Sequence, residues 1–176
     1  MFQVTIKDAT GFSAEAIKKL VVSLDLWERA WNTEEFKQRI INYSYKATYT
    51  TGKLWWKKTY TQAENGFYFA PGEDKFTNEQ VYEKLMVEKT FNIVLKNPIN
   101  PFTSAVAYTD FNSKTVYLYK KYFWNASQER LANTLSHEIG CHLSGFSHTF
   151  NYTKLRDYSV PYAVGDITEE IAMKLL

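Results

Sequence analysis

One short segment contains every histidine of this 176-residue chain. The segment runs from Ser136 to His148 and places histidines at positions 137, 142 and 148. Neutral imidazole is a good zinc ligand, and a catalytic zinc ion takes three protein ligands and keeps one position for water. We therefore predict that His137, His142 and His148 bind a Zn²⁺ ion, and that the chain folds so that the three rings meet.

Glu138 directly follows the first of these histidines. A carboxylate beside a metal ligand can accept a proton from water and pass it to the leaving amine of a cleaved peptide bond. Glu138 is therefore the predicted catalytic base. Gly145 lies where a glycine in the left-handed conformation would end the helix, and a turn there would bring His148 back towards the other two histidines.

The segment resembles the metzincin metallopeptidase signature, H-E-x-x-H-x-x-G-x-x-H. The second half matches, as His142-Leu143-Ser144-Gly145-Phe146-Ser147-His148, but three residues separate Glu138 from His142 where the family has two. The later segment from Ser159 to Tyr162 is similar to one in a group of small bacterial and phage metallopeptidase-like proteins. The resemblance implies a zincin-type fold, zinc-dependent hydrolysis of peptide bonds, and a peptide or protein substrate.

The extra residue conflicts with a regular α-helix. At about 100° per residue, ligands four residues apart diverge by about 40° around the helix, and ligands five apart by about 140°. A single-turn π-bulge can absorb the extra residue, and Gly140 makes such a distortion easier. The same spacing occurs in the dipeptidyl-peptidase III family, whose helix binds zinc through both histidines. Two alternatives stay open: Cys141 is the second ligand as a thiolate, or the site is degenerate and binds metal poorly.

The resemblance also implies where a substrate would bind. Metzincin-like peptidases hold an extended peptide against an edge strand that precedes the metal-binding helix. By this resemblance residues 104–109 form the edge strand, and Ala105, Ala107 and Thr109 bind the substrate. The family has a methionine-containing turn beneath the zinc, and residues 159–162, which lack methionine, are the candidate for an equivalent turn. Three roles stay open for Tyr162 in that turn: it borders the substrate pocket, it binds the oxyanion, or it is a tyrosine of the core.

Hydrophobic periodicity and capping residues predict the other elements. Asn32 is predicted to cap the second helix, and Leu131, Leu135 and Ile139 are predicted to face the core. The predicted strands are residues 2–7, 45–50, 54–60 and 91–95, with a hairpin formed by 104–110 and 115–120. The predicted helices are residues 14–30, 33–42, 77–87, about 127–144 and 167–176.

The length predicts a single domain over residues 1–176. The formal net charge of +2 is too small to favour nucleic acid or an anionic membrane as a partner, and no apolar run is long enough to span a bilayer. Cys141 is the one cysteine, which excludes an internal disulfide and suits a reducing compartment. The first residues lack the basic and apolar regions of a signal peptide, so we expect none. We therefore expect a monomeric, cytoplasmic protein.

The predicted fold class is α+β and zincin-like or metzincin-like, with a small mixed sheet packed on helices, an active-site helix and a short C-terminal subdomain. The predicted function is that of a zinc metalloendopeptidase in which Glu138 activates water. The alternative is a catalytically degenerate zinc-binding domain that binds a peptide or protein partner. A third hypothesis makes Cys141 a redox or metal switch, because a thiolate could compete for zinc.

Overall fold

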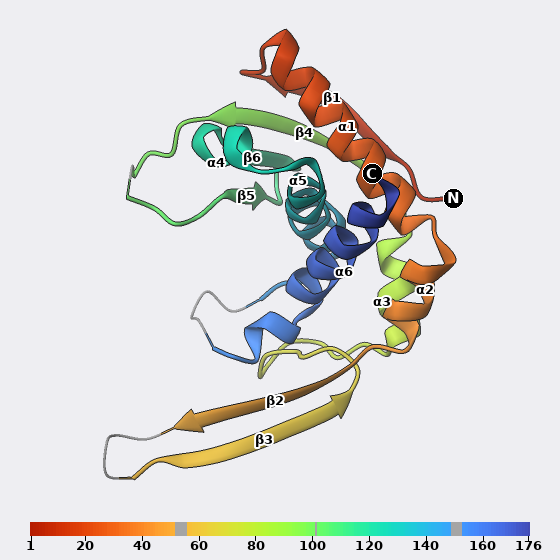
Figure 1. The fold of residues 1–176 in the computed structure, drawn as a ribbon, viewed down its shortest axis with the longest axis vertical. Coiled ribbons are helices and arrows are strands. Elements are labelled where there is room, and N and C mark those ends of the chain that lie inside the picture. Colours follow the sequence, from red (N-terminus) through yellow and green to blue (C-terminus); the bar gives the residue numbers. More distant parts are fainter. Residues whose placement is uncertain (52–55, 101, 149–152) are drawn as a thin grey trace.

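A computed structural model describes residues 1–51, 56–100, 102–148 and 153–176, and the fold is α+β (Figure 1). The main sheet has the strand order β1-β4-β6-β5. Strands β1 (Val4–Thr10), β4 (Lys89–Lys96) and β6 (Thr115–Tyr119) run parallel, and β5 (Ala107–Asp110) pairs antiparallel with β6 at the edge. The predicted hairpin is confirmed, and its first strand is an edge strand. The strand is shorter than predicted, so Ala105 precedes it.

Six α-helices lie in the described part of the chain. They are α1 (Ala14–Trp31), α2 (Glu34–Ile41), α3 (Asn78–Leu85), α4 (Lys120–Asn125), α5 (Gln128–Leu135) and α6 (Val160–Leu175). The predicted cap of α2 was wrong, because Thr33 and not Asn32 accepts the hydrogen bond from the first turn. Asn32 instead ends α1, and its side chain bonds both the backbone N–H and the carbonyl of Phe2. Helix α4 was not predicted.

The hydrophobic core lies between the main sheet and the helices. Phe91, Ile93 and Leu95 on one face of β4 are buried, while the residues that alternate with them are partly exposed. The three core positions predicted for the metal-binding helix are also buried; they are Leu131, Leu135 and Ile139. Figure 1 shows α5 and α6 side by side in the centre of the molecule, next to the sheet. No helix in the described residues is both long and apolar enough to cross a membrane.

The C-terminal region differs from the prediction. Residues 159–162 were expected to form a turn and 167–176 a separate helix, but one helix, α6, runs from Val160 to Leu175. Ser159 takes the extended conformation of an N-cap residue, and Pro161 lies in the first turn, where the missing N–H of proline costs no helical hydrogen bond. Gly165 is tolerated inside the helix because Asn133 of α5 packs directly against it.

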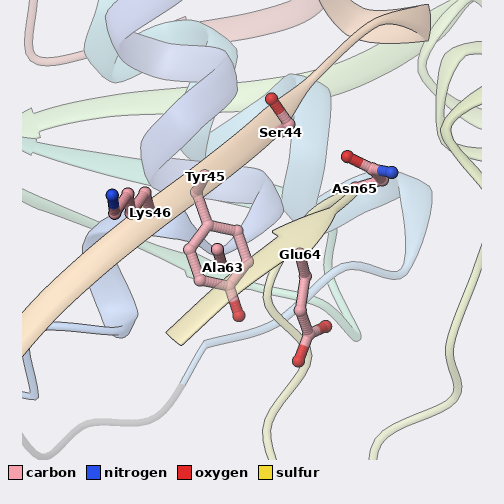
Figure 2. Close-up of a pocket in the computed structure, with 6 residues that line it drawn as sticks. All are labelled: Ser44, Tyr45, Lys46, Ala63, Glu64 and Asn65. Atoms are coloured by element: carbon pink, nitrogen blue, oxygen red, sulfur yellow. The ribbon is translucent and has the colours of Figure 1, made fainter. Parts of the chain in front are cut away.

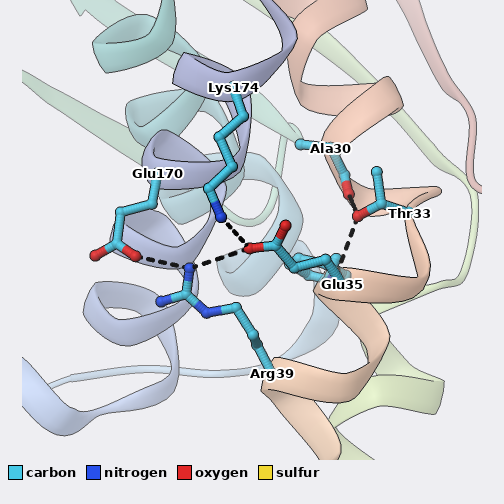
Figure 3. A network of polar contacts seen from close by, with 7 residues as sticks. Ala30, Thr33, Glu35, Arg39, Glu170 and Lys174 are labelled. Atoms are coloured by element: carbon cyan, nitrogen blue, oxygen red, sulfur yellow. Dashed lines mark hydrogen bonds and ion pairs between the residues drawn. The ribbon is translucent and has the colours of Figure 1, made fainter.

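Helices α2 and α6 are joined by an exposed network of charged side chains (Figure 3). Glu35 of α2 lies 2.6 Å from the Lys174 ammonium and 3.9 Å from the Arg39 guanidinium, which in turn lies 2.7 Å from Glu170. Exposed ion pairs of this kind each contribute about 0–1 kcal/mol. The network therefore adds little to the stability of the fold.

A second, two-stranded sheet extends away from the rest of the molecule (Figure 1). Its strands are β2 (Ser44–Thr51) and β3 (Lys58–Asn65). The predicted second strand, 54–60, was placed too early, and part of it lies outside the described residues. Figure 2 shows a pocket at the end of this hairpin away from its tip. No residue predicted for the metal site lines this pocket, whose walls are Ser44, Tyr45, Lys46, Ala63, Glu64 and Asn65.

The segment that carries His137 and His142 packs tightly against two tryptophans of α1. Trp27 and Trp31 are both fully buried, and the Trp31 indole N–H donates a 2.8 Å hydrogen bond to the Thr168 hydroxyl of α6. A Cβ atom built on Gly140 would lie only 2.4 Å from the tip of the Trp31 ring. Position 140 therefore requires glycine because the tryptophan ring fills the space of a side chain.

This contact predicts that Gly140→Ala destabilises the fold. Replacing glycine by alanine in a helix normally adds up to about 1 kcal/mol of stability, but overpacking a core costs about 1–3 kcal/mol. We expect a net loss in the free energy of unfolding, measured by chemical denaturation. Trp31→Phe shortens the opposing ring, so the double variant should lose less than the sum of the two single variants. A stabilising Gly140→Ala would contradict this packing argument.

Candidate metal centre

Helix α5 leads without a break into the segment that carries the histidines. Residues Ser136–Cys141 are π-helical, and His142–Ser144 form a 3₁₀ turn. The His142 N–H bonds the His137 carbonyl, five residues earlier, which is the hydrogen bond that defines a π-helix. The predicted π-bulge is thus confirmed. The π-helical turn points residues five apart towards the same side of the helix, whereas an α-helix would place them about 140° apart around its axis.

A Schellman motif then reverses the chain. Gly145 has φ 86°, its N–H bonds the His142 carbonyl, and the Phe146 N–H bonds the Cys141 carbonyl. The Ser147 hydroxyl donates a 2.5 Å hydrogen bond to the Glu73 carboxylate. These contacts fix the segment between the second and third histidines, and the predicted left-handed role of Gly145 is confirmed.

The three histidines form one cluster. The ligand atoms of His137, His142 and His148 all lie within 4.8 Å of one another, and the Nε2 atoms of His137 and His148 are 3.2 Å apart. Two nitrogens bound to one tetrahedral zinc at 2.0–2.1 Å would be separated by roughly 3.3 Å. The distance between His137 and His148 therefore fits two ligands of one metal ion, and the donor of His142 lies within 4.8 Å of both.

Backbone carbonyls orient two of the three rings. His142 Nδ1 lies 2.8 Å from the Phe146 carbonyl, so this nitrogen carries the hydrogen and Nε2 keeps its lone pair. The His137 ring bonds the carbonyl of Pro161 in the first turn of α6. Histidines that bind metals commonly donate their other N–H to such a carbonyl, which fixes the tautomer and the orientation of the ring.

Burial also holds two of the rings in their neutral form. The pKa of His137 lies well below its ordinary value because the ring is desolvated and because His142 and His148 are close. Desolvation lowers the pKa of His142 as well, against the opposing effect of its hydrogen bond to Phe146. Neutral imidazole is the form that binds metals, so the folded chain favours the state that can take up an ion.

Glu138 is buried beside the cluster and contacts the edge strand. The Thr109 hydroxyl of β5 lies 2.7 Å from its Oε2 and 2.8 Å from its backbone carbonyl oxygen. Burial raises the pKa of the Glu138 carboxyl, whereas the Thr109 hydrogen bond and the nearby His148 oppose this rise. A raised pKa brings a carboxyl closer to the value that suits a general base near neutral pH.

Tyr162 lies against the histidines. Its ring centroid is 4.7 Å from that of His137 and 4.9 Å from that of His148, so the structure brings this predicted residue to the cluster. Sequence reasoning missed two further neighbours. The Arg156 guanidinium lies over the Tyr162 ring, 4.8 Å from its centroid, and Phe111 packs edge-on against His142. Phe111 lies in the turn between β5 and β6, and Arg156 begins a three-residue 3₁₀ helix, Arg156–Tyr158; neither segment is long enough for a periodic pattern to mark an inward residue.

Cys141 does not join the cluster, so the alternative ligand set was wrong. Its thiol is fully buried and faces the Val160 carbonyl at 4.0 Å. Burial raises the pKa of the thiol well above its ordinary value, although Lys89 opposes this. The thiolate needed for a zinc ligand or for a redox or metal switch is therefore disfavoured at this position.

The predicted substrate-binding residues lie in different surroundings. Thr109 and Ala107 are in β5, and Ala107 is largely buried opposite Leu118 of β6, while the exposed Ala105 lies before the strand.

A second pocket adjoins the segment that precedes His148. Its lining residues are Phe69, Gly72, Glu73, Asp74, Phe76, Lys84, Gly145, Phe146, Ser147 and Val160.

Comparisons of this chain with protein-family models, with curated proteins and with solved structures found no match. The α+β fold and the cluster of three histidines on a helical segment therefore rest on the sequence and the structure themselves.

The lowered histidine pKa values predict how zinc affinity depends on pH. Protons compete with zinc for imidazole, so three ligands with ordinary pKa values of 6.5 would lose about fiftyfold in affinity between pH 7.5 and 6.0. His137 and His142 stay neutral to lower pH than this, and we expect a loss of less than about tenfold. Competition with a chromophoric chelator at both pH values measures the loss, and a fiftyfold decrease would refute the expectation.

Proposed function

We propose that this protein is a zinc-dependent peptidase of zincin type. The observation that carries the proposal is the contact between three elements at one place. The three histidines gather at the end of the π-helical segment, Glu138 lies buried beside them, and edge strand β5 touches Glu138 through Thr109. A metal site, a base and a strand that can hold a peptide are the parts that peptide hydrolysis requires.

The residues would share the work as follows. Zinc, when bound by His137, His142 and His148, supplies a Lewis acid that polarises the peptide carbonyl and lowers the pKa of water. Glu138 accepts the proton of the attacking water and returns it to the nitrogen of the leaving amine. Tyr162, which packs on two of the histidine rings, borders the place where the carbonyl oxygen would lie.

Strand β5 would hold the substrate. Within the described residues it pairs with β6 alone, and an extended peptide can add to such a sheet edge through main-chain hydrogen bonds. The main chain around Ala105, Ala107 and Thr109 would make these bonds. A peptide held there would lie beside Glu138, because the Thr109 side chain already bonds its carboxylate.

The proposal predicts that Glu138→Gln abolishes most peptide hydrolysis while the fold and the bound zinc remain. Glutamine has the same size but cannot accept the proton, and loss of a general base lowers kcat by about 10²–10⁴-fold. His137→Ala should lose zinc and activity together. Elemental mass spectrometry measures the zinc content of each variant. Cleavage of a peptide library measures its hydrolytic activity. Glu129→Gln in α5 is the matched control and should leave both unchanged.

The same measurements separate the proposal from its alternative. One zinc ion per chain without hydrolysis of any library peptide would favour a zinc-binding domain that recognises a peptide or protein. No zinc even after loading at neutral pH would refute the metal site.

A further inference from the structure

The Thr109 side chain has a position that main-chain binding of a substrate does not explain. Its hydroxyl leaves the edge strand and reaches two oxygens of Glu138, the backbone carbonyl at 2.8 Å and carboxylate Oε2 at 2.7 Å. Both distances are within the range of an O–H···O hydrogen bond, and the single hydroxyl hydrogen can be donated to either oxygen. One side chain of the sheet thus contacts both the main chain of the π-helical segment and the functional group of its glutamate.

The strand gives this hydroxyl a fixed place. Thr109 pairs with Val116 of the fully buried part of β6, and a β-branched side chain has few rotamers on a strand. The Glu138 side chain has three rotatable bonds, and without a partner it would sample several orientations. A stiff donor at hydrogen-bonding distance removes that freedom before a substrate arrives, which is how a catalytic group is held ready.

We propose that Thr109 is a positioning residue that holds Glu138 in its reactive orientation. This inference rests on the proposed peptidase function and adds a side-chain role to a residue that otherwise binds substrate through its main chain. Since Thr109 also belongs to the strand that holds the peptide, the distance between the bound peptide and the base would be set by a single residue.

Because the Thr109 hydroxyl lies near both Oε2 and the backbone carbonyl of Glu138, it can hold the Glu138 side chain both as a carboxylate and as a protonated carboxyl. A hydroxyl has one hydrogen and two lone pairs, so while Glu138 is a carboxylate Thr109 donates to Oε2. After Glu138 has taken the proton of the attacking water, its own O–H can donate to the Thr109 oxygen, and the Thr109 hydrogen turns to the Glu138 carbonyl. When the proton moves to the leaving amine, the hydroxyl turns back. The side chain is therefore held throughout the reaction.

The test compares Thr109→Val with Thr109→Ser in the zinc-loaded protein. Valine keeps the shape and removes the hydroxyl, so we expect kcat to fall about tenfold or more while KM changes less than twofold and zinc is retained. Serine keeps the hydroxyl and should stay within about threefold of the wild-type kcat. Thr115→Val, the same substitution on neighbouring β6 where the hydroxyl bonds Ser113, should leave kcat unchanged.

Three results would overturn the inference. The first is an unchanged kcat in Thr109→Val, and the second is an equal loss in Thr109→Ser, which would assign the effect to packing. The third is a loss confined to KM, which would leave Thr109 with substrate binding alone. Should Thr109→Val fail to fold, Thr109→Ala removes the same hydroxyl and gives the same comparison.

The wild-type and Glu138→Gln proteins show which proposal has failed. A wild-type protein that binds zinc and cleaves no peptide would refute the peptidase function, and the role of Thr109 with it. An active wild type, an inactive Glu138→Gln and a fully active Thr109→Val would refute the positioning role alone.

Discussion

The structure depends on one geometric constraint: three imidazoles must meet although the first two are five residues apart on a helix. An α-helix would point these rings in different directions, and the π-helical winding of Ser136–Cys141 points them together. The neighbouring elements fit that winding. Trp31 fills the space beside Gly140, the Ser144 hydroxyl bonds the Gly140 carbonyl, and the Thr109 hydroxyl lies within hydrogen-bonding distance of both the carbonyl and the carboxylate of Glu138. A widened turn, which alone would be poorly stable, is thus supported from α1, from β5 and from its own C-terminal end.

Local sequence patterns were sufficient to predict the centre of this arrangement. The three histidines, the adjacent glutamate and Gly145 lie within thirteen residues of one another, so their relation depends on helix geometry and one turn, both of which follow from spacing. The helix after Ser13 and the edge hairpin were predicted for the same reason, because a capping hydroxyl and a run of β-branched and aromatic residues act over a few neighbours.

The sequence-based predictions that were wrong or incomplete concern features that depend on contacts between distant residues. A serine followed by Val-Pro-Tyr is consistent with a turn or with the start of a helix, and the packing of α6 on α5 decides for the helix. Cys141 has the spacing of a ligand, but the π-helical winding turns it into the core. The bond from Thr109 to Glu138 joins residues 29 apart in the sequence, and no pattern in either segment announces it.

The fit of Gly140 against Trp31 also bears on how such a site can change over evolutionary time. Deleting this one glycine would leave His137-Glu138-Ile139-Cys141-His142, with the four-residue spacing of the more familiar signature. Since the π-helical turn accommodates one extra residue, its deletion would restore a regular α-helical turn and keep Leu131 and Leu135 on the buried face. The obstacle is instead the packing: Gly140 is the residue that leaves room for the Trp31 ring, so a lineage would pass between the two spacings only if the tryptophan-lined interior changed with them.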